Sequence, residues 1–267
     1  MSAATLDALL SGEADPVFAR RVRAVLAFLP PTRSTLVVDV GCGRGYYLGY
    51  YAALGQGTIV GLERDPRTAA LARTALAAHA AAHVAIGDAT ALPFADASVD
   101  GIVMSEVLEH VDDDRRALAE AARVLRRGGV VALTVPHARY PWLWDPVNRT
   151  RASLGLAPLR EGPFAGIWAG HVRLYEQDGL AALARDAGFE VTASRSFGRV
   201  SWPFAHNLIY GFGKALLDSG RAPASLARAV DRRGGATGAS PWRALRAAFL
   251  WPDRFNRDDE GRGAATV

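Results

Sequence analysis

The stretch Leu36–Tyr47, LVVDVGCGRGYY, decides the fold that we predict for this chain. Its first half is apolar and β-branched, which predicts a buried strand. Its second half places Gly41, Gly43 and Gly45 at alternate positions before an apolar helical run. Glycines at such a turn let the backbone approach a ligand closely, and the helix start offers unpaired N–H groups. The stretch therefore predicts a nucleotide-binding corner of an α/β sheet.

The spacing of these glycines bears on which ligand binds. Dinucleotide-binding folds use G-x-G-x-x-G, with a pyrophosphate over the helix N-terminus. Here the pattern is D-x-G-x-G-x-G, and Tyr46 stands where the third dinucleotide glycine would be. The carboxylate of Asp39 at the strand end suits a cationic ligand and would repel a pyrophosphate. The pattern disfavours a nicotinamide enzyme, which we keep as an alternative.

Further short apolar runs follow at regular intervals and alternate with helical patterns. We expect strands at 58–62, 83–86, 101–104 and 130–135. This alternation predicts a mostly parallel sheet with helices on both faces, and ligands bind at the carboxyl edge of such a sheet. Glu63 follows the second strand, where a carboxylate can accept hydrogen bonds from both ribose hydroxyls.

Four motifs in this order resemble those of the class I methyltransferases that use S-adenosylmethionine (SAM), in the UbiE/UbiG-like (type 11) branch. Besides the glycine turn and the acid after the second strand, they are GDATALPFADASVD at 87–100 and RVLRRGGVVALTVP at 123–136. The resemblance covers about residues 30 to 197 and implies a Rossmann-like fold with SAM as cofactor. It implies that Asp39 and the glycine turn hold the amino-acid part of SAM, and that Asp88 binds the adenine amino group. The full set of cofactor-binding candidates is Asp39, Gly41, Cys42, Gly43, Gly45, Glu63, Arg64, Asp88, Ala89, Ser105 and Glu106.

Histidines at the predicted ligand edge are the candidates for catalysis. Methyl transfer from a sulfonium needs alignment, exclusion of water and, for some acceptors, removal of a proton. Histidine is the side chain best tuned for that step near neutral pH. We rank His171 and His110 above His137 as the catalytic base. The chain has one cysteine, Cys42, and its H-x-x-x-H pair, His79 and His83, flanks a helix-to-strand turn away from this edge. We therefore expect no metal site.

The region from 136 to 170 is rich in aromatic residues and departs from the alternating core. Following the fifth strand, it is expected to lie above the cofactor edge as a lid insertion over an acceptor pocket. A small cluster that packs only on itself is an equal alternative. The predicted substrate-binding residues are His137, Tyr140, Trp144 and Trp168.

We divide the chain into a helical segment at 1–34, a methyltransferase core at 35–197 and a partly helical extension at 198–267. The family's seventh strand has no clear counterpart, and 263–267 is the candidate for it. A basic amphipathic helix at 240–251 carries Trp242, Leu245 and Phe249 on one face. Such a helix can lie on an anionic membrane, although more often it packs on its own domain.

Composition limits the other classes of function. The chain has 267 residues, 50% of them hydrophobic, and a formal net charge of +4. Its basic residues are nearly all arginine without a dense run, so we expect no nucleic-acid partner. Neither a leader peptide nor a membrane span is evident, so we expect a cytoplasmic protein with optional peripheral contact at the membrane.

These patterns together predict a SAM-dependent methyltransferase. We expect it to act on a small or lipid-like acceptor, with an oxygen atom favoured. A non-catalytic SAM-binding module is the main alternative, because intact cofactor residues do not prove turnover.

Overall fold

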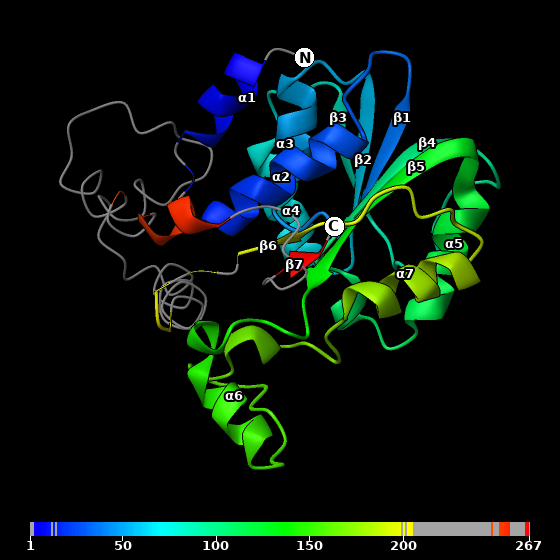
Figure 1. Cartoon of the computed structure of the whole chain (residues 1–267). Coiled ribbons are helices and arrows are strands. Elements are labelled where there is room, and N and C mark those ends of the chain that lie inside the picture. Colours follow the sequence, from blue (N-terminus) through cyan, green and yellow to red (C-terminus); the bar gives the residue numbers. More distant parts are fainter. Residues whose placement is uncertain are drawn as a thin grey trace.

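The computed structural model describes residues 3–11, 13, 15–198, 200, 202–204, 247, 251–256 and 265–266. Over these residues the chain forms a seven-stranded sheet with the strand order β3-β2-β1-β4-β5-β7-β6 (Figure 1). The first five strands pair in parallel, and β7 is antiparallel to both of its neighbours. The strands are β1 Leu36–Val40, β2 Thr58–Glu63, β3 Ala82–Ile86, β4 Val99–Ser105, β5 Leu125–Pro136, β6 Ser196–Phe197 and β7 Ala265–Thr266.

Helices connect the parallel strands and extend the chain at its start. Three of them begin alike, with Asp15, Asp65 or Asp145 as the capping residue and proline in the first turn. That combination satisfies the first free N–H groups and fixes the entry angle of the chain. The α-helices are α1 Ala3–Leu10, α2 Pro16–Phe28, α3 Tyr46–Ala53, α4 Pro66–Ala75, α5 Asp114–Val124, α6 Pro146–Ser153 and α7 Gln177–Asp186. The short 3₁₀ helices are η1 Leu108–His110, η2 Trp142–Trp144, η3 Gly166–Trp168 and η5 Trp251–Phe255.

Alternation along the strands separates two hydrophobic cores. Val37 and Val103 point to the core shared with α2 and α3. Val38 and Ile102, one residue away, point to the core shared with α5 and α7. Figure 1 shows these helix pairs on opposite sides of the sheet. The predicted Rossmann-like α/β fold, a mostly parallel sheet covered on both faces, is confirmed.

The strand order reverses between β1 and β4, which places a ligand crevice at their carboxyl ends. The glycine turn leaves β1 at this point, and η1 follows β4. Val107 lies between them: a Cβ added at Gly41 would stand 2.7 Å from Val107 Cγ2. The turn and the segment after β4 are therefore packed against each other.

The segment after β5 has a polar centre of its own. Asp145, fully buried, caps α6 and accepts hydrogen bonds from the Asn148 side chain at 2.7 Å and from the Ile167 N–H at 3.2 Å. Gly166 is needed beside it, because an added Cβ would stand 2.1 Å from the Asp145 carboxylate. Figure 1 shows α6 set apart from the sheet, beyond the arrowhead of β5.

The seventh strand is found within the segment that the sequence offered for it. β7 lies between β5 and β6, with Thr266 opposite both Val135 and Ser196. The amphipathic helix expected at 240–251 lies almost entirely outside the described residues, and so does most of the extension from 198 onward. Within the described part of the chain, no helix is long and apolar enough to cross a membrane. The division into 1–34, 35–197 and 198–267 stays a prediction.

One glycine of the sheet offers a test of the packing. Gly61, in β2 opposite Asp39, has space for no side chain, because its Cβ would stand 2.5 Å from Leu48 Cδ1 and 2.7 Å from Cys42 Sγ. We expect Gly61→Ala to lower the free energy of unfolding by about 1–3 kcal/mol, measured by urea denaturation. The matched control is Gly179→Ala in α7, where the Cβ meets nothing within 4 Å among the described residues and should be neutral or stabilising. Equal effects of the two substitutions would contradict this account.

Candidate active site

The glycine turn has the backbone that only glycine adopts without strain. Gly41, Gly43 and Gly45 have φ values of 69°, 54° and 79°. A Cβ at Gly45 would meet Leu76 Cδ1 at 2.7 Å, whereas one at Gly43 would meet no described atom within 4 Å. Gly41 and Gly45 are thus required by packing, and Gly43 leaves open space at the turn. Between them Cys42 is buried, and burial raises the pKa of its thiol. Both observations favour a packing role, and its part in cofactor binding stays a prediction.

Two acids stand beside this turn. Asp39 is 2% exposed, and its Oδ2 has no hydrogen-bond partner within the described part of the chain. Burial, and then the charge of Glu63, raise the pKa of Asp39 well above its usual range. Glu63 accepts hydrogen bonds from the N–H groups of Gly43 and Asp65, both at 2.9 Å. Two carboxyl groups therefore meet at the strand ends, where a positively charged ligand would favour their ionised forms.

The next predicted cofactor residues follow β3. Asp88 Oδ1 accepts hydrogen bonds from the N–H and the hydroxyl of Thr90 at 2.8 and 2.7 Å. These bonds lower the pKa of Asp88, with a smaller contribution from the exposed Arg64, so the group is a carboxylate at neutral pH. Ala89, next to it, is half-buried.

Ser105 and Glu106 complete the predicted set after β4. Ser105 Oγ lies 2.8 Å from Thr134 Oγ1 and 3.3 Å from the Tyr47 hydroxyl. Glu106 has a φ of 58°, which is rare for a residue other than glycine. Its carboxylate accepts a hydrogen bond from Thr134 at 3.1 Å and pairs with Arg21 at 2.7 Å.

Arg21 is a site residue that the sequence analysis did not single out. It lies on α2, 7% exposed, three residues after Phe18 and one before Val22. The sequence pattern could have indicated Arg21, because it is a charged residue on the otherwise apolar face of a predicted helix. The ion pair with Glu106 fastens α2 to the segment after β4.

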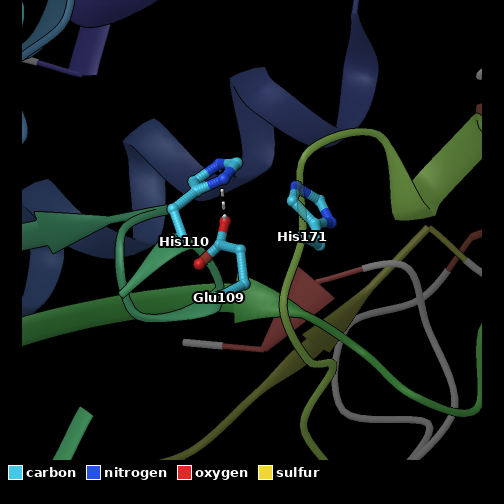
Figure 2. Close-up of side chains that lie close together, drawn as sticks. All are labelled: Glu109, His110 and His171. Atoms are coloured by element: carbon cyan, nitrogen blue, oxygen red, sulfur yellow. Dashed lines mark ion pairs between the residues drawn. The ribbon is translucent and has the colours of Figure 1, made fainter. Parts of the chain in front are cut away.

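A cluster of three side chains, Glu109, His110 and His171, lies beyond this pair (Figure 2). Each offers one ligand atom, and those atoms all lie within 4.8 Å of one another. The rings of His110 and His171 meet edge to face with centroids 4.7 Å apart, and His110 Nε2 lies 3.9 Å from Glu109 Oε1. The structure thus brings the two predicted catalytic histidines together. It adds Glu109, whose only signal in the sequence was its place beside His110.

Glu109 is the unusual member of the Glu109–His110–His171 cluster. It is fully buried, and neither carboxylate oxygen has a hydrogen-bond partner among the residues that the structure describes. Burial first, and then the charge of Glu106, raise the pKa of Glu109 well above its usual range. Buried carboxylates are normally paired or hydrogen-bonded, so this one calls for a physical reason.

The segment 170–175 holds η1 in place. The Val172 N–H donates to the Glu109 carbonyl at 2.7 Å, and His110 Nδ1 lies 2.9 Å from the Gly170 carbonyl oxygen. The Arg173 side chain donates to the Val111 carbonyl at 2.5 Å, and the Tyr175 hydroxyl donates to the Leu108 carbonyl at 3.2 Å. These bonds fix the backbone on which the cluster stands.

The predicted substrate residues are placed differently from one another. His137 is 1% exposed, its Nδ1 accepts a hydrogen bond from the Arg139 N–H at 2.9 Å, and burial lowers its pKa. Tyr140 and Trp144 belong to the core shared with α2 and α3, and Trp168 packs against that core half-buried. This burial favours packing for Tyr140 and Trp144, and a contact with the acceptor stays a prediction for all four residues.

Comparisons with known proteins agree with this geometry. The family described as "Methyltransferase domain" matches residues 38–133. The O-methyltransferase cnsE of Penicillium expansum is 31% identical over 181 residues, which cover 67% of this chain and 60% of that protein. A probable S-adenosylmethionine-dependent methyltransferase of Mycolicibacterium smegmatis is 29% identical, covering 77% of this chain and 66% of that protein. The chain thus spans about 60 to 66% of the length of these two relatives.

A solved structure shows the same fold. A SAM-dependent methyltransferase from Thermotoga maritima, described as a possible histamine N-methyltransferase, superposes with a TM-score of 0.51 at 25% identity. The superposition covers 69% of this chain and 76% of that one. The fold and the glycine turn define a class I SAM-dependent methyltransferase domain. Residues 38–133 belong to the methyltransferase-domain family, and the narrower UbiE/UbiG-like branch stays a prediction.

The residues present fit SAM, the cofactor of this class. The unpartnered oxygen of Asp39 suits the cationic amino-acid part, and the open face of Gly43 leaves room for it. Glu63 and Asp88 are carboxyl groups at successive strand ends, where ribose hydroxyls and an adenine amino group can donate to them.

Substitution of these two acids tests the cofactor site. We expect Glu63→Ala and Asp88→Ala each to weaken SAM binding about tenfold or more, because each removes a charged hydrogen-bond acceptor. Titration calorimetry measures the affinity. Asp96→Ala is the matched control, since Asp96 lies in the same 87–100 stretch with its side chain 79% exposed. Unchanged affinity in both acid variants would contradict the assignment.

Asp39 allows a test in which stability and binding move in opposite directions. Because its pKa is raised in the folded chain, its contribution to stability is present below about pH 4 and is lost as the pH rises through the folded pKa. Asp39→Asn removes the buried charge. We therefore expect its free energy of unfolding to exceed that of the wild type by an amount that grows from pH 4 to pH 7, while SAM binding weakens. A variant less stable than the wild type at pH 7 would contradict this.

Proposed function

We propose that this chain transfers the methyl group of SAM to a hydroxyl oxygen of a small or lipid-like acceptor. The observation that carries the proposal is the Glu109–His110–His171 cluster. It stands after β4, on the segment that packs against the glycine turn through Val107. Cofactor residues and proton-handling groups thus share one edge of the sheet.

Methyl transfer from SAM needs no covalent intermediate with the protein. SAM supplies a methyl carbon already activated by its sulfonium. A bond forms between the acceptor oxygen and that carbon while the carbon–sulfur bond breaks with its electron pair going to sulfur, and the hydroxyl proton is released. Asp39, Glu63 and Asp88 orient the cofactor, and the Glu109–His110–His171 cluster receives the acceptor hydroxyl and assists the loss of its proton.

Oxygen is favoured over nitrogen on two grounds. A hydroxyl needs help to lose its proton, and two imidazoles beside a carboxylate supply groups for that step, whereas a neutral amine can attack without them. The relative from Penicillium expansum is named an O-methyltransferase. The Thermotoga maritima structure, described as a possible N-methyltransferase, is the reason to test both acceptor types.

An apolar acceptor is supported by exposed apolar side chains on the segment after β5, for which a lid role stays a prediction. Trp142, Leu143 and Phe164 are 56%, 44% and 48% exposed on the segment after β5. Exposed apolar residues of this size commonly mark a surface that meets an apolar partner or ligand.

A non-catalytic SAM-binding module is the second candidate. It would keep Asp39, Glu63 and Asp88, and it would have no use for two imidazoles against a buried carboxylate. Turnover separates the two readings, whereas SAM affinity does not.

The proposal is tested by methyl transfer from radiolabelled SAM into a cell extract that is then split into organic and aqueous phases. We expect label in the organic phase with the wild type. His110→Asn and His171→Asn should reduce transfer at least about a hundredfold with SAM affinity unchanged. His83→Asn, on the exposed side of β3, is the matched control. Wild-type rates in both cluster variants would contradict the assignment, and SAM binding without any transfer would favour the non-catalytic module.

A further inference from the structure

The Glu109–His110–His171 cluster has the residue types and the ligand-atom spacing of a metal site. The sequence analysis predicted no metal site, and it could not associate Glu109 and His110 with His171, which lies far from them along the chain. Folding of the 170–175 segment onto η1 brings their ligand atoms within 4.8 Å of one another. Figure 2 shows Glu109 and His110 on the segment after β4, with His171 on the segment that leads to α7.

The hydrogen bond of His110 fixes which ring nitrogen is available. The Gly170 carbonyl oxygen can only accept, so His110 Nδ1, 2.9 Å away, carries the proton. In the neutral ring Nε2 then keeps its lone pair, and this atom lies 3.9 Å from Glu109 Oε1. Metal-binding histidines are typically oriented in this way, with the second nitrogen donating to a carbonyl or a carboxylate.

Backbone hydrogen bonds also fix the position of His171. Its N–H donates to the Trp168 carbonyl at 3.1 Å, and the next residue, Val172, donates to the Glu109 carbonyl at 2.7 Å. Gly170, just before it, has a φ of 72°, and an added Cβ would lie 3.8 Å from the His110 ring. The three side chains are thus held on one rigid backbone unit.

We propose that Glu109, His110 and His171 bind one divalent cation of the first transition row. Two imidazole nitrogens and one carboxylate are ligands that suit Mn²⁺, Fe²⁺ or Zn²⁺. Mg²⁺ and Ca²⁺ instead prefer sites made of oxygen atoms alone. Three protein ligands also leave coordination positions open for another molecule, as in catalytic metal sites.

The charge balance supports a cation at this place. Glu106 already has Arg21 as its partner at 2.7 Å, whereas the two oxygens of Glu109 have no hydrogen-bond donor within the described residues. Leaving a buried carboxylate without a partner costs free energy, which a coordinated cation would return.

A consequence for the substrate rests on the proposed function. A cation with open positions can take the acceptor hydroxyl as a ligand and lower its pKa, so that the oxygen attacks as an alkoxide or phenolate. If the coordination number leaves at least two positions open, an acceptor with two adjacent oxygen atoms, such as a catechol, suits the site best. His110 and His171 then serve as ligands, and the proton passes to solvent as the oxygen–carbon bond forms.

Cation binding is tested first, without any activity assay. Chelator-treated protein is titrated with Mn²⁺, followed by loss of the free-ion EPR signal. We expect one Mn²⁺ per chain for the wild type and for the control His83→Asn. Glu109→Gln and His171→Asn should weaken binding at least about tenfold, since even the groups that orient metal ligands contribute ten- to a hundredfold. Absence of Mn²⁺ binding, or equal binding in all variants, would overturn the proposal.

Thermal unfolding separates a ligand role from a structural one. If Glu109 is a ligand, metal-free Glu109→Gln is at least as stable as the metal-free wild type, because an unpaired buried charge has been removed. Mn²⁺ then raises the midpoint of the wild type and leaves that of the variant unchanged. A metal-free variant that is less stable, together with no Mn²⁺ effect on the wild type, would show that Glu109 only supports the fold.

The cation site and the proposed function can fail separately. Mn²⁺ binding without transfer to a catechol or to any extract acceptor would retain the site and reject the methyltransferase proposal. Transfer to a hydroxyl that is equally fast in chelator would retain the methyltransferase and reject a role for the cation in transfer, leaving an imidazole as the base.

Discussion

Burial of negative charge at the carboxyl edge of the sheet is the constraint on which the site depends. Asp39 and Glu109 are removed from water, and both have raised pKa values because burial penalises the charged form. Glu106, three residues before Glu109, instead pairs with the buried Arg21 at 2.7 Å. A fold that keeps such groups gives up stability in the free protein, and cationic ligands restore it on binding. The sulfonium cofactor and the proposed divalent cation are two ligands of this kind.

The elements around this edge hold its parts in register. Val107 packs on Gly41 and so couples the segment after β4 to the glycine turn. Arg21 ties α2 to the same segment, and residues 170–175 bind it from the other side. A displacement of η1 would therefore disturb the cofactor turn and the Glu109–His110–His171 cluster together. The chemistry is assembled on one short stretch that three separate parts of the chain hold.

The sheet and the cofactor turn could be predicted from sequence because their signals are local. Apolar runs, alternating glycines and an acid after a strand are each recognised within a dozen residues, whereas the strand order came from the structure. Glu109 and Arg21 were missed because their burial depends on contacts between segments that are distant in sequence. In the SEVLEH stretch a glutamate has the sequence pattern of an exposed residue, and its burial becomes evident only once the 170–175 segment packs on η1. Tyr140 and Trp144 show the opposite limit, since an aromatic composition alone does not distinguish a ligand contact from a core.

The position of β7 has a consequence for how the chain reaches this structure during synthesis. β1 to β5 can pair as soon as residues up to 136 have left the ribosome. Within the described part of the chain, β6 pairs with the sheet through β7, which is made about seventy residues later. Until then Val135 and Pro136, the two residues of β5 that pair with β7, stay open to other strands. Misfolding of shortened chains would therefore be expected at this edge, which adjoins Thr134 and through it Glu106 of the candidate site.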